Sequence, residues 1–85
     1  MVKKTVKVQL DGGLEARPVA VLVQVASQFD SAVYVEADGR KVNAKSIMGM
    51  MTLGLAAGDS VIVEIDGKDE QIALESIEKY LSGKL

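Results

Sequence analysis

Residues 14–29 read LEARPVAVLVQVASQF, and the secondary structure of this stretch decides the fold class. Valine occupies every second position from Val19 to Val25, a period typical of a strand. Against a strand, Pro18 stands where a first helical turn begins, and the stretch is longer than most strands. A helix is therefore favoured, while the valine period leaves a strand open. In the helix, Val19, Leu22, Val25, Ala26 and Phe29 form an apolar stripe, and Arg17, Ala20, Gln24 and Ser27 lie opposite.

Alternating apolar residues predict three strands around this helix. Residues 2–10, 32–36 and 60–65 each place apolar side chains at every second position, so that one face of each strand can be buried. The apolar positions are Val6, Val8, Leu10, Val33, Val35, Val61, Val63 and Ile65.

The dipeptide Asp38-Gly39 separates two short β-rich runs and predicts a hairpin. A type I′ turn needs positive φ at both central residues, which Gly and Asp tolerate. We therefore expect a return strand at about residues 40–43. Further turn signals are Asp11-Gly12-Gly13, Gly58-Asp59 and Asp66-Gly67.

Ser46 precedes a short methionine-rich run, IMGMM, and is predicted to cap a helix that ends near Gly54. At helical spacing, one face carries Ile47, Met48 and Met51, and another carries Met50 and Leu53. The second face can be buried while the first is offered to a partner. The alternative is a capped helix whose methionines all fill the core.

A last helix is predicted after Asp69, which can cap it, and before Gly83, which can end it. Its apolar residues, at the spacing of one helix face, are Ala73, Leu74, Ile77, Tyr80 and Leu81. The predicted order is strand, helix, strand, strand, helix, strand, helix. Helices on one face of an antiparallel sheet is the natural α+β solution for this order.

The composition narrows the function. The 85 residues predict a single domain, residues 1–85, without His or Cys, so that the commonest general base and metal ligands are missing. We therefore predict no enzyme activity, no cofactor and no metal. The net charge of −2 predicts no direct nucleic-acid binding. No signal peptide is expected, because residues 1–4 run into an alternating segment and not into an apolar one. No membrane span is expected either, because the longest apolar stretch, residues 19–26, is too short; a cytoplasmic protein is predicted.

Two motifs, GLEARP at residues 13–18 and NAKSIMG at residues 43–49, resemble motifs of the HPr family, the phosphocarriers of the bacterial sugar phosphotransferase system. Residues 13–18, GLEARP, are similar to the family signature Gly-Leu-His-Ala-Arg-Pro. Residues 43–49, NAKSIMG, resemble the regulatory serine motif of HPr proteins from Gram-positive bacteria. The spacing and the element order also fit. The resemblance implies an open-faced β-sandwich, a four-stranded antiparallel sheet with three helices on one face.

Glu15 departs from the family, because it stands where the phosphoryl-accepting histidine belongs. The resemblance therefore narrows to the catabolite-repression HPr-like proteins, or Crh, which also lack that histidine. These proteins typically carry Gln at the position, so Glu15 departs from their pattern too. Glu15 is interpreted either as a carboxylate near a helix start or as a permanent imitation of an occupied site. Phosphoryl transfer through its carboxylate is a further alternative.

The resemblance implies phosphorylation of Ser46 by the bifunctional HPr kinase/phosphorylase. The product would act as corepressor of catabolite control protein A, a LacI-type repressor that binds operator DNA. The residues that match the partner-binding surface are Arg17, Ala20, Gln24, Ile47, Met48 and Met51.

Two other functions compete with this regulatory one. A phosphotransferase carrier is opposed by the absence of histidine. A small module that binds a metabolic enzyme would use the same exposed face. The sequence leaves monomer and homodimer open, since the strand at residues 2–10 could pair with another chain.

We predict that Glu15→His accepts phosphate from phosphoenolpyruvate and enzyme I, because Arg17, Pro18 and the preceding Gly13-Leu14 are present. Radiolabel transfer with and without enzyme I measures this, and the product should be acid-labile, unlike a serine ester. The native chain should take no label; labelling of it would revive the carboxylate carrier. An unlabelled Glu15→His would show that position 15 is not the sole block.

Overall fold

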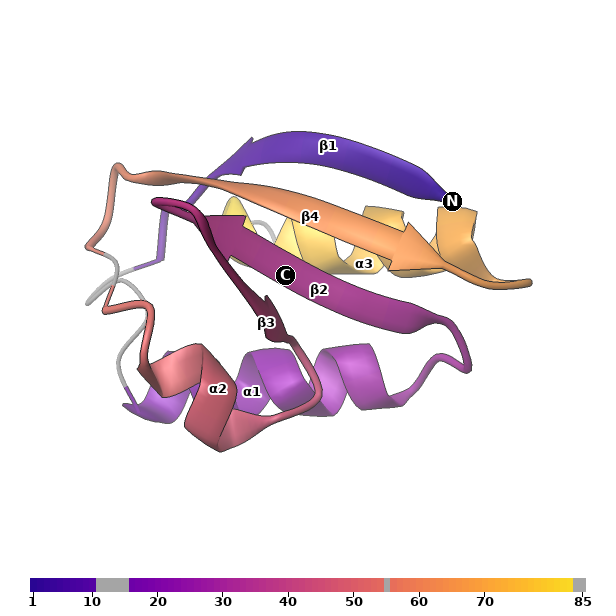
Figure 1. Ribbon diagram of the computed structural model, residues 1–85, viewed down its shortest axis with the longest axis horizontal. Helices are drawn as coiled ribbons and strands as arrows, with labels where there is room; N and C mark the ends of the chain where they lie inside the picture. The colour runs from indigo at the N-terminus through magenta and orange to yellow at the C-terminus, as the bar shows by residue number, and fades with distance from the viewer. Residues whose placement is uncertain (11–15, 55, 84–85) are drawn as a thin grey trace.

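The computed structural model describes residues 1–10, 16–54 and 56–83 and confirms the predicted order of elements (Figure 1). The described part of the chain forms an antiparallel sheet in the order β1-β4-β2-β3, with helices packed on one face. The elements are β1 (Val2–Lys7), α1 (Ala16–Ser27), β2 (Ala32–Ala37), β3 (Arg40–Asn43), α2 (Ile47–Met51), β4 (Ser60–Asp66) and α3 (Glu70–Leu81).

The core lies between the sheet and the helices and is aliphatic. The predicted inner face of the strands is confirmed, because its valines and Ile65 are buried and only Leu10 is partly exposed. The helices contribute buried residues at the predicted spacing, namely Val19, Leu22, Ala26, Met50, Ala73, Ile77 and Leu81. None of the helices described is long and apolar enough to cross a membrane.

The stretch that decides the fold is a helix, as predicted, but its described part is shorter than residues 14–29. α1 is described from Ala16, and residues 11–15 lie outside the described part of the chain. The predicted end at Phe29 is wrong. The N–H groups of Gln28 and Phe29 donate to the carbonyls three residues earlier, at 3.3 and 3.2 Å, which tightens the last turn and ends the α-helix at Ser27.

Two other predicted ends are also corrected. β1 stops at Lys7, not Leu10. The N–H of the next residue, Val8, donates to the carbonyl of Asp59 (2.8 Å), which comes directly before β4 in the sequence. α2 stops at Met51, not near Gly54. At this end of α2, the N–H and the hydroxyl of Thr52 both donate to the carbonyl of Gly49. The two remaining predicted strands extend by one residue each, to Ala37 and Asp66.

The turn and stop predictions agree with the backbone. Asp38 and Gly39 have φ of 52° and 76°, the positive values that a type I′ hairpin requires. Gly83 follows α3 with a φ of 77°, which suits the residue that ends a helix. The hairpin and the stop of the last helix are therefore confirmed.

The position predicted for Asp69 is confirmed, but the capping role predicted for its side chain is wrong. Asp69 occupies the N-cap position of α3, but its side chain makes no capping hydrogen bond. Its carboxylate instead accepts from the N–H groups of Asp30 (2.9 Å) and Ser31 (3.0 Å) and from the Ser31 hydroxyl. The side chain therefore joins the start of α3 to the loop between α1 and β2, 38 residues away in sequence.

This junction predicts a pH dependence of stability. The Ser31 hydroxyl, followed by the N–H of Asp30, holds the pKa of Asp69 below its ordinary value. A lowered carboxyl pKa stabilises the fold above the unfolded-state pKa of about 4, and that stabilisation is lost as the pH falls through the folded-state pKa. Asp69→Asn should therefore melt below the native chain at pH 7, and the difference should shrink below about pH 4.

The melting temperatures of both chains, measured at several pH values from about 7 to about 2.5, test this prediction. Asp66→Asn is the control, because the Asp66 side chain is 62% exposed and meets only the N-terminal amine, 3.6 Å away, among the interactions described. A difference between native and Asp69→Asn chains that stays constant with pH would contradict the assignment.

Candidate functional site

Ser46 caps α2, as the sequence predicts. Its backbone is extended (φ −113°, ψ 114°), and its Oγ accepts a hydrogen bond from the N–H of Gly49 at 3.2 Å. Its carbonyl accepts from the N–H of Met50 at 3.0 Å and so begins the helical ladder. These bonds satisfy N–H groups that a helix start would otherwise leave free. Ser46 itself is half-buried.

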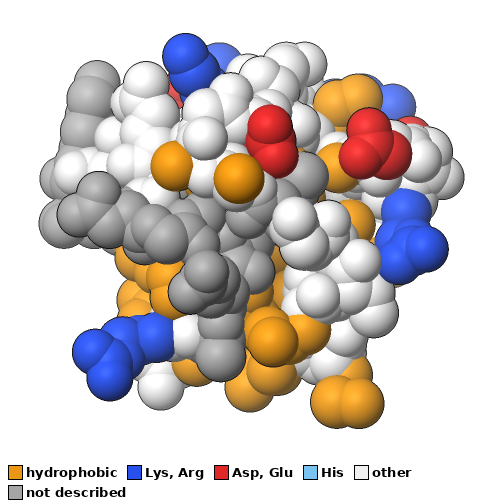
Figure 2. Space-filling view, turned by 90° about the vertical axis from the view of Figure 1, so that its left-hand side faces the viewer, with side chains coloured by type: hydrophobic (Ala, Val, Ile, Leu, Met, Phe, Trp, Pro, Cys, Tyr) orange, Lys and Arg blue, Asp and Glu red, His pale blue; other side chains and the backbone are white. Residues whose placement is uncertain are grey.

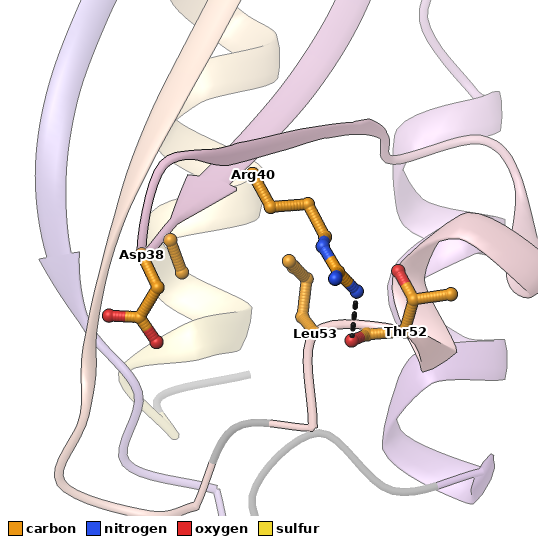
Figure 3. A pocket seen from close by; sticks show the side chains of 5 residues that line it. Asp38, Arg40, Thr52 and Leu53 are labelled. Atoms are coloured by element: carbon orange, nitrogen blue, oxygen red, sulfur yellow. Dashed lines mark hydrogen bonds between the residues drawn. The ribbon is translucent and has the colours of Figure 1, made fainter.

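The five-residue α2 is too short to be stable alone, and contacts from other elements hold both its ends. At the first end, the Nζ of Lys45 donates to the carbonyl of Phe29, just beyond α1, at 2.7 Å. At the other end, the guanidinium of Arg40 in β3 donates to the carbonyl of Thr52 at 3.0 Å (Figure 3). The helix that carries Ser46 is thereby fixed to α1 and to the sheet.

A pocket lies between the β2–β3 hairpin and the end of α2. Figure 3 shows the Arg40 guanidinium turned toward Thr52, while the side chain of Asp38 is turned away from that contact. Within the described residues, no group of acidic side chains could hold a metal ion. In this pocket the guanidinium of Arg40 joins β3 to the end of α2. The pocket is lined by Ala37, Asp38, Arg40, Thr52 and Leu53.

The methionines of α2 divide as one of the two interpretations predicts. Met50 is fully buried, whereas Met48 is 81% exposed and Met51 is 44% exposed. Ile47 is 48% exposed and Leu53 is half-buried. The alternative, in which every methionine fills the core, is wrong. α2 consequently presents three large apolar side chains to the surface directly after Ser46.

The candidate residues of α1 lie on the neighbouring helix. Arg17 and Gln24 are exposed and Ala20 is half-buried, and α1 packs against α2. Figure 2, in which the left-hand side of Figure 1 faces the viewer, shows hydrophobic side chains gathered in the lower part of the molecule, where Figure 1 places α1 and α2. Sequence reasoning missed Val21, which is 38% exposed. Its spacing from Arg17 and Gln24 on a helix was the signal that could have found it.

We use the name α1–α2 surface for these exposed or half-buried residues of α1 and α2 together. The predicted residue Glu15 lies outside the described residues, so the structure adds nothing about it. The α1–α2 surface consists of Arg17, Ala20, Val21, Gln24, Ile47, Met48 and Met51.

Comparison with known proteins assigns the class. The fold is an α+β open-faced sandwich, and residues 2–82 match the family described as "PTS HPr component phosphorylation site". The chain belongs to the HPr family. The crystal structure of HPr-C-His from Thermoanaerobacter tengcongensis superposes with a TM-score of 0.93 at 43% identity, covering 99% of this chain and 94% of that one.

Within the family, the chain is similar to HPr-like proteins named Crh. It is 51% identical to Crh of Bacillus subtilis over 81 residues, 95% of each chain. It is 47% identical to Crh of Halalkalibacterium halodurans over 81 residues, 95% of this chain and 96% of that one. The crystal structure of B. subtilis Crh, described as an intertwined dimer with a swapped domain, matches with a TM-score of 0.81 at 48% identity, covering 100% and 98% of the two chains.

The division of methionines predicts unequal effects of their replacement on stability. Met50→Ala should lower the free energy of unfolding by about 2–5 kcal/mol, because it empties a buried site. Met48→Ala should change it by less than about 0.5 kcal/mol, because the side chain is mostly in water. Urea unfolding measures both, and each variant controls for the other, since both replace a methionine of α2. Equal destabilisation would contradict the assignment of faces.

Proposed function

We propose that the chain is a regulatory protein of carbon catabolite repression, switched by phosphorylation of Ser46. The HPr kinase/phosphorylase adds the phosphate, and the modified chain is a corepressor of catabolite control protein A. In this role the protein is a substrate and a binding partner in the cytoplasm, and it is not an enzyme. The observation that carries the proposal is the position of Ser46, at the head of a helix that exposes Ile47, Met48 and Met51.

The modification replaces the proton of the Ser46 hydroxyl by a phosphoryl group. Oγ forms a bond to the γ-phosphorus of ATP as the bond from that phosphorus to the bridging oxygen of ADP breaks, and the hydroxyl proton passes to a base of the kinase. The product carries about −1.5 to −2 additional charge and three acceptor oxygens. Negative charge beside the first N–H groups of a helix is favourable, so we expect the fold to tolerate it.

The α1–α2 surface supports a binding role for the modified chain. A phosphate pairs well with Arg or Lys of a partner, in charge-assisted hydrogen bonds. The apolar contact would come from Ile47, Met48 and Met51, and the flexible thioether of Met adapts to an irregular partner surface. Exposed Arg17 and Gln24 on α1 offer polar contacts beside them.

Two further observations bear on the proposal. The chain contains no histidine, which supports a regulator and opposes a phosphohistidine carrier. The sequence leaves monomer and homodimer open. The intertwined dimer described for B. subtilis Crh supports the homodimer.

The test is intact mass after incubation with HPr kinase/phosphorylase and ATP. The native chain should gain one phosphate, and Ser46→Ala should gain none, because the acceptor oxygen is removed. The phosphorylated chain should bind catabolite control protein A, and the unmodified chain should bind weakly or not at all. In the phosphorylated form, Met48→Ala should weaken binding by about 1–2 kcal/mol.

Two outcomes would contradict the proposal. A phosphate gained by Ser46→Ala would move the modification to another residue. Phosphorylation of Ser46 without any gain in repressor binding would favour the competing function, and a pull-down with both forms of the chain would then identify a metabolic enzyme as the partner. Thr52→Ala serves as a control for the mass measurement, because Thr52 is the nearest hydroxyl in sequence after Ser46.

A further inference from the structure

Gly49 is a glycine that the fold itself does not need. It is helical in α2, and it is absent from the glycines with positive φ in the described chain. A Cβ added to it would lie 3.5 Å from the Ser46 Oγ, 3.5 Å from the Val42 Cβ and 3.6 Å from the Ser46 Cβ, all ordinary van der Waals contacts. Alanine would therefore fit, and alanine is the better helix former. Neither backbone conformation nor packing explains the glycine.

The space left open by Gly49 lies directly beside the Ser46 hydroxyl. The N–H of Gly49 donates to that oxygen at 3.2 Å, so the backbone of residue 49 and the Ser46 Oγ already face each other. A methyl group on residue 49 would touch Oγ at van der Waals distance and fill this side of it. Any atom bonded to Oγ on that side would then overlap the methyl group.

We propose that Gly49 determines whether Ser46 can carry a phosphate. Its bare Cα leaves room for the phosphate beside the N–H of residue 49, in the way that glycine elsewhere lets a backbone approach a ligand closely. The phosphoserine needs this glycine, and the unmodified fold does not. The inference rests on the proposed phosphorylation of Ser46 and names a second residue that phosphorylation requires.

The test compares native chain and Gly49→Ala, each before and after treatment with HPr kinase/phosphorylase and ATP. Before treatment, Gly49→Ala should melt at or above the native temperature. After treatment, the native chain should melt no lower than before, whereas phosphorylated Gly49→Ala should melt about 4 °C or more below its unmodified form. The initial rate of phosphate gain, followed by intact mass, should be about tenfold lower for Gly49→Ala.

The double variant Ser46→Ala/Gly49→Ala is the matched control. It carries the added methyl group but cannot be modified, so kinase treatment should leave its melting temperature unchanged. Any fall in this control would show that the treatment, and not the phosphate, destabilises the chain, and the inference would fail.

The remaining outcomes separate the inference from the proposed function. If the native chain gains no phosphate, the proposed function fails and the inference fails with it. If both chains gain phosphate and neither melts lower, the proposed function stands and the inference is overturned, even where Gly49→Ala reacts more slowly, because slower reaction alone reflects contact with the kinase. An unmodified Gly49→Ala that melts well below the native chain would also overturn it.

Discussion

The sheet depends on β4, the last strand in the sequence and an inner strand in space. β4 pairs with β1 from Val2↔Ile65 to Lys7↔Ser60 and with β2 from Ala32↔Asp66 to Glu36↔Ile62. Among the strands that the structure describes, β1 and β2 do not pair with each other, and β4 joins the N-terminal strand to the hairpin. The inner side chains of β4 are also buried under the helices. Both the sheet and the core therefore require residues 60–66.

The two faces of β4 stabilise the sheet by different means. On the outer face, the Glu64 carboxylate meets the Nζ atoms of Lys41 (2.6 Å) and Lys3 (3.4 Å), which come from the strands on either side of the β4–β2 pair. The hydrogen bond from Lys41, assisted by the bond from Lys3, lowers the pKa of Glu64. Lys41 also lies 5.0 Å from the centre of the Tyr34 ring. The inner face is apolar, and the helices cover it.

Local patterns predicted much of this structure, and contacts across the chain account for the rest. The hairpin at Asp38-Gly39 and the cap at Ser46 follow from residues within four positions of each other. The helix at α1 was decided by Pro18 and by the length of the stretch, although the valine period also suits a strand. By contrast, the carboxylate of Asp69 could not be placed from the sequence, because its partners lie 38 and 39 residues away.

The same limit applies to the candidate site. Helical spacing offered Ile47, Met48 and Met51 as one face of α2 but left open a helix whose methionines all fill the core, and the burial of Met50 decides between the two. It did not show what fixes the helix, since the contact of Lys45 with Phe29 spans 16 residues and that of Arg40 with Thr52 spans 12. Residue 15 lies outside the described residues, so its role rests on the sequence.

The hydrogen bonds at both ends of α2, from Lys45 to Phe29 and from Arg40 to Thr52, bear on how phosphorylation of Ser46 would act. α2 is joined to the end of α1 through Lys45 and to β3 through Arg40, and neither hydrogen bond uses the Ser46 hydroxyl that the phosphate would replace. In the proposed mechanism, phosphorylation therefore changes the surface and leaves the fold as it is. The net charge moves from −2 to about −4, and the new charge lies next to three exposed apolar side chains. A partner that pairs with the phosphate and covers the apolar side chains together distinguishes the modified chain, because either feature alone contributes only part of the binding free energy.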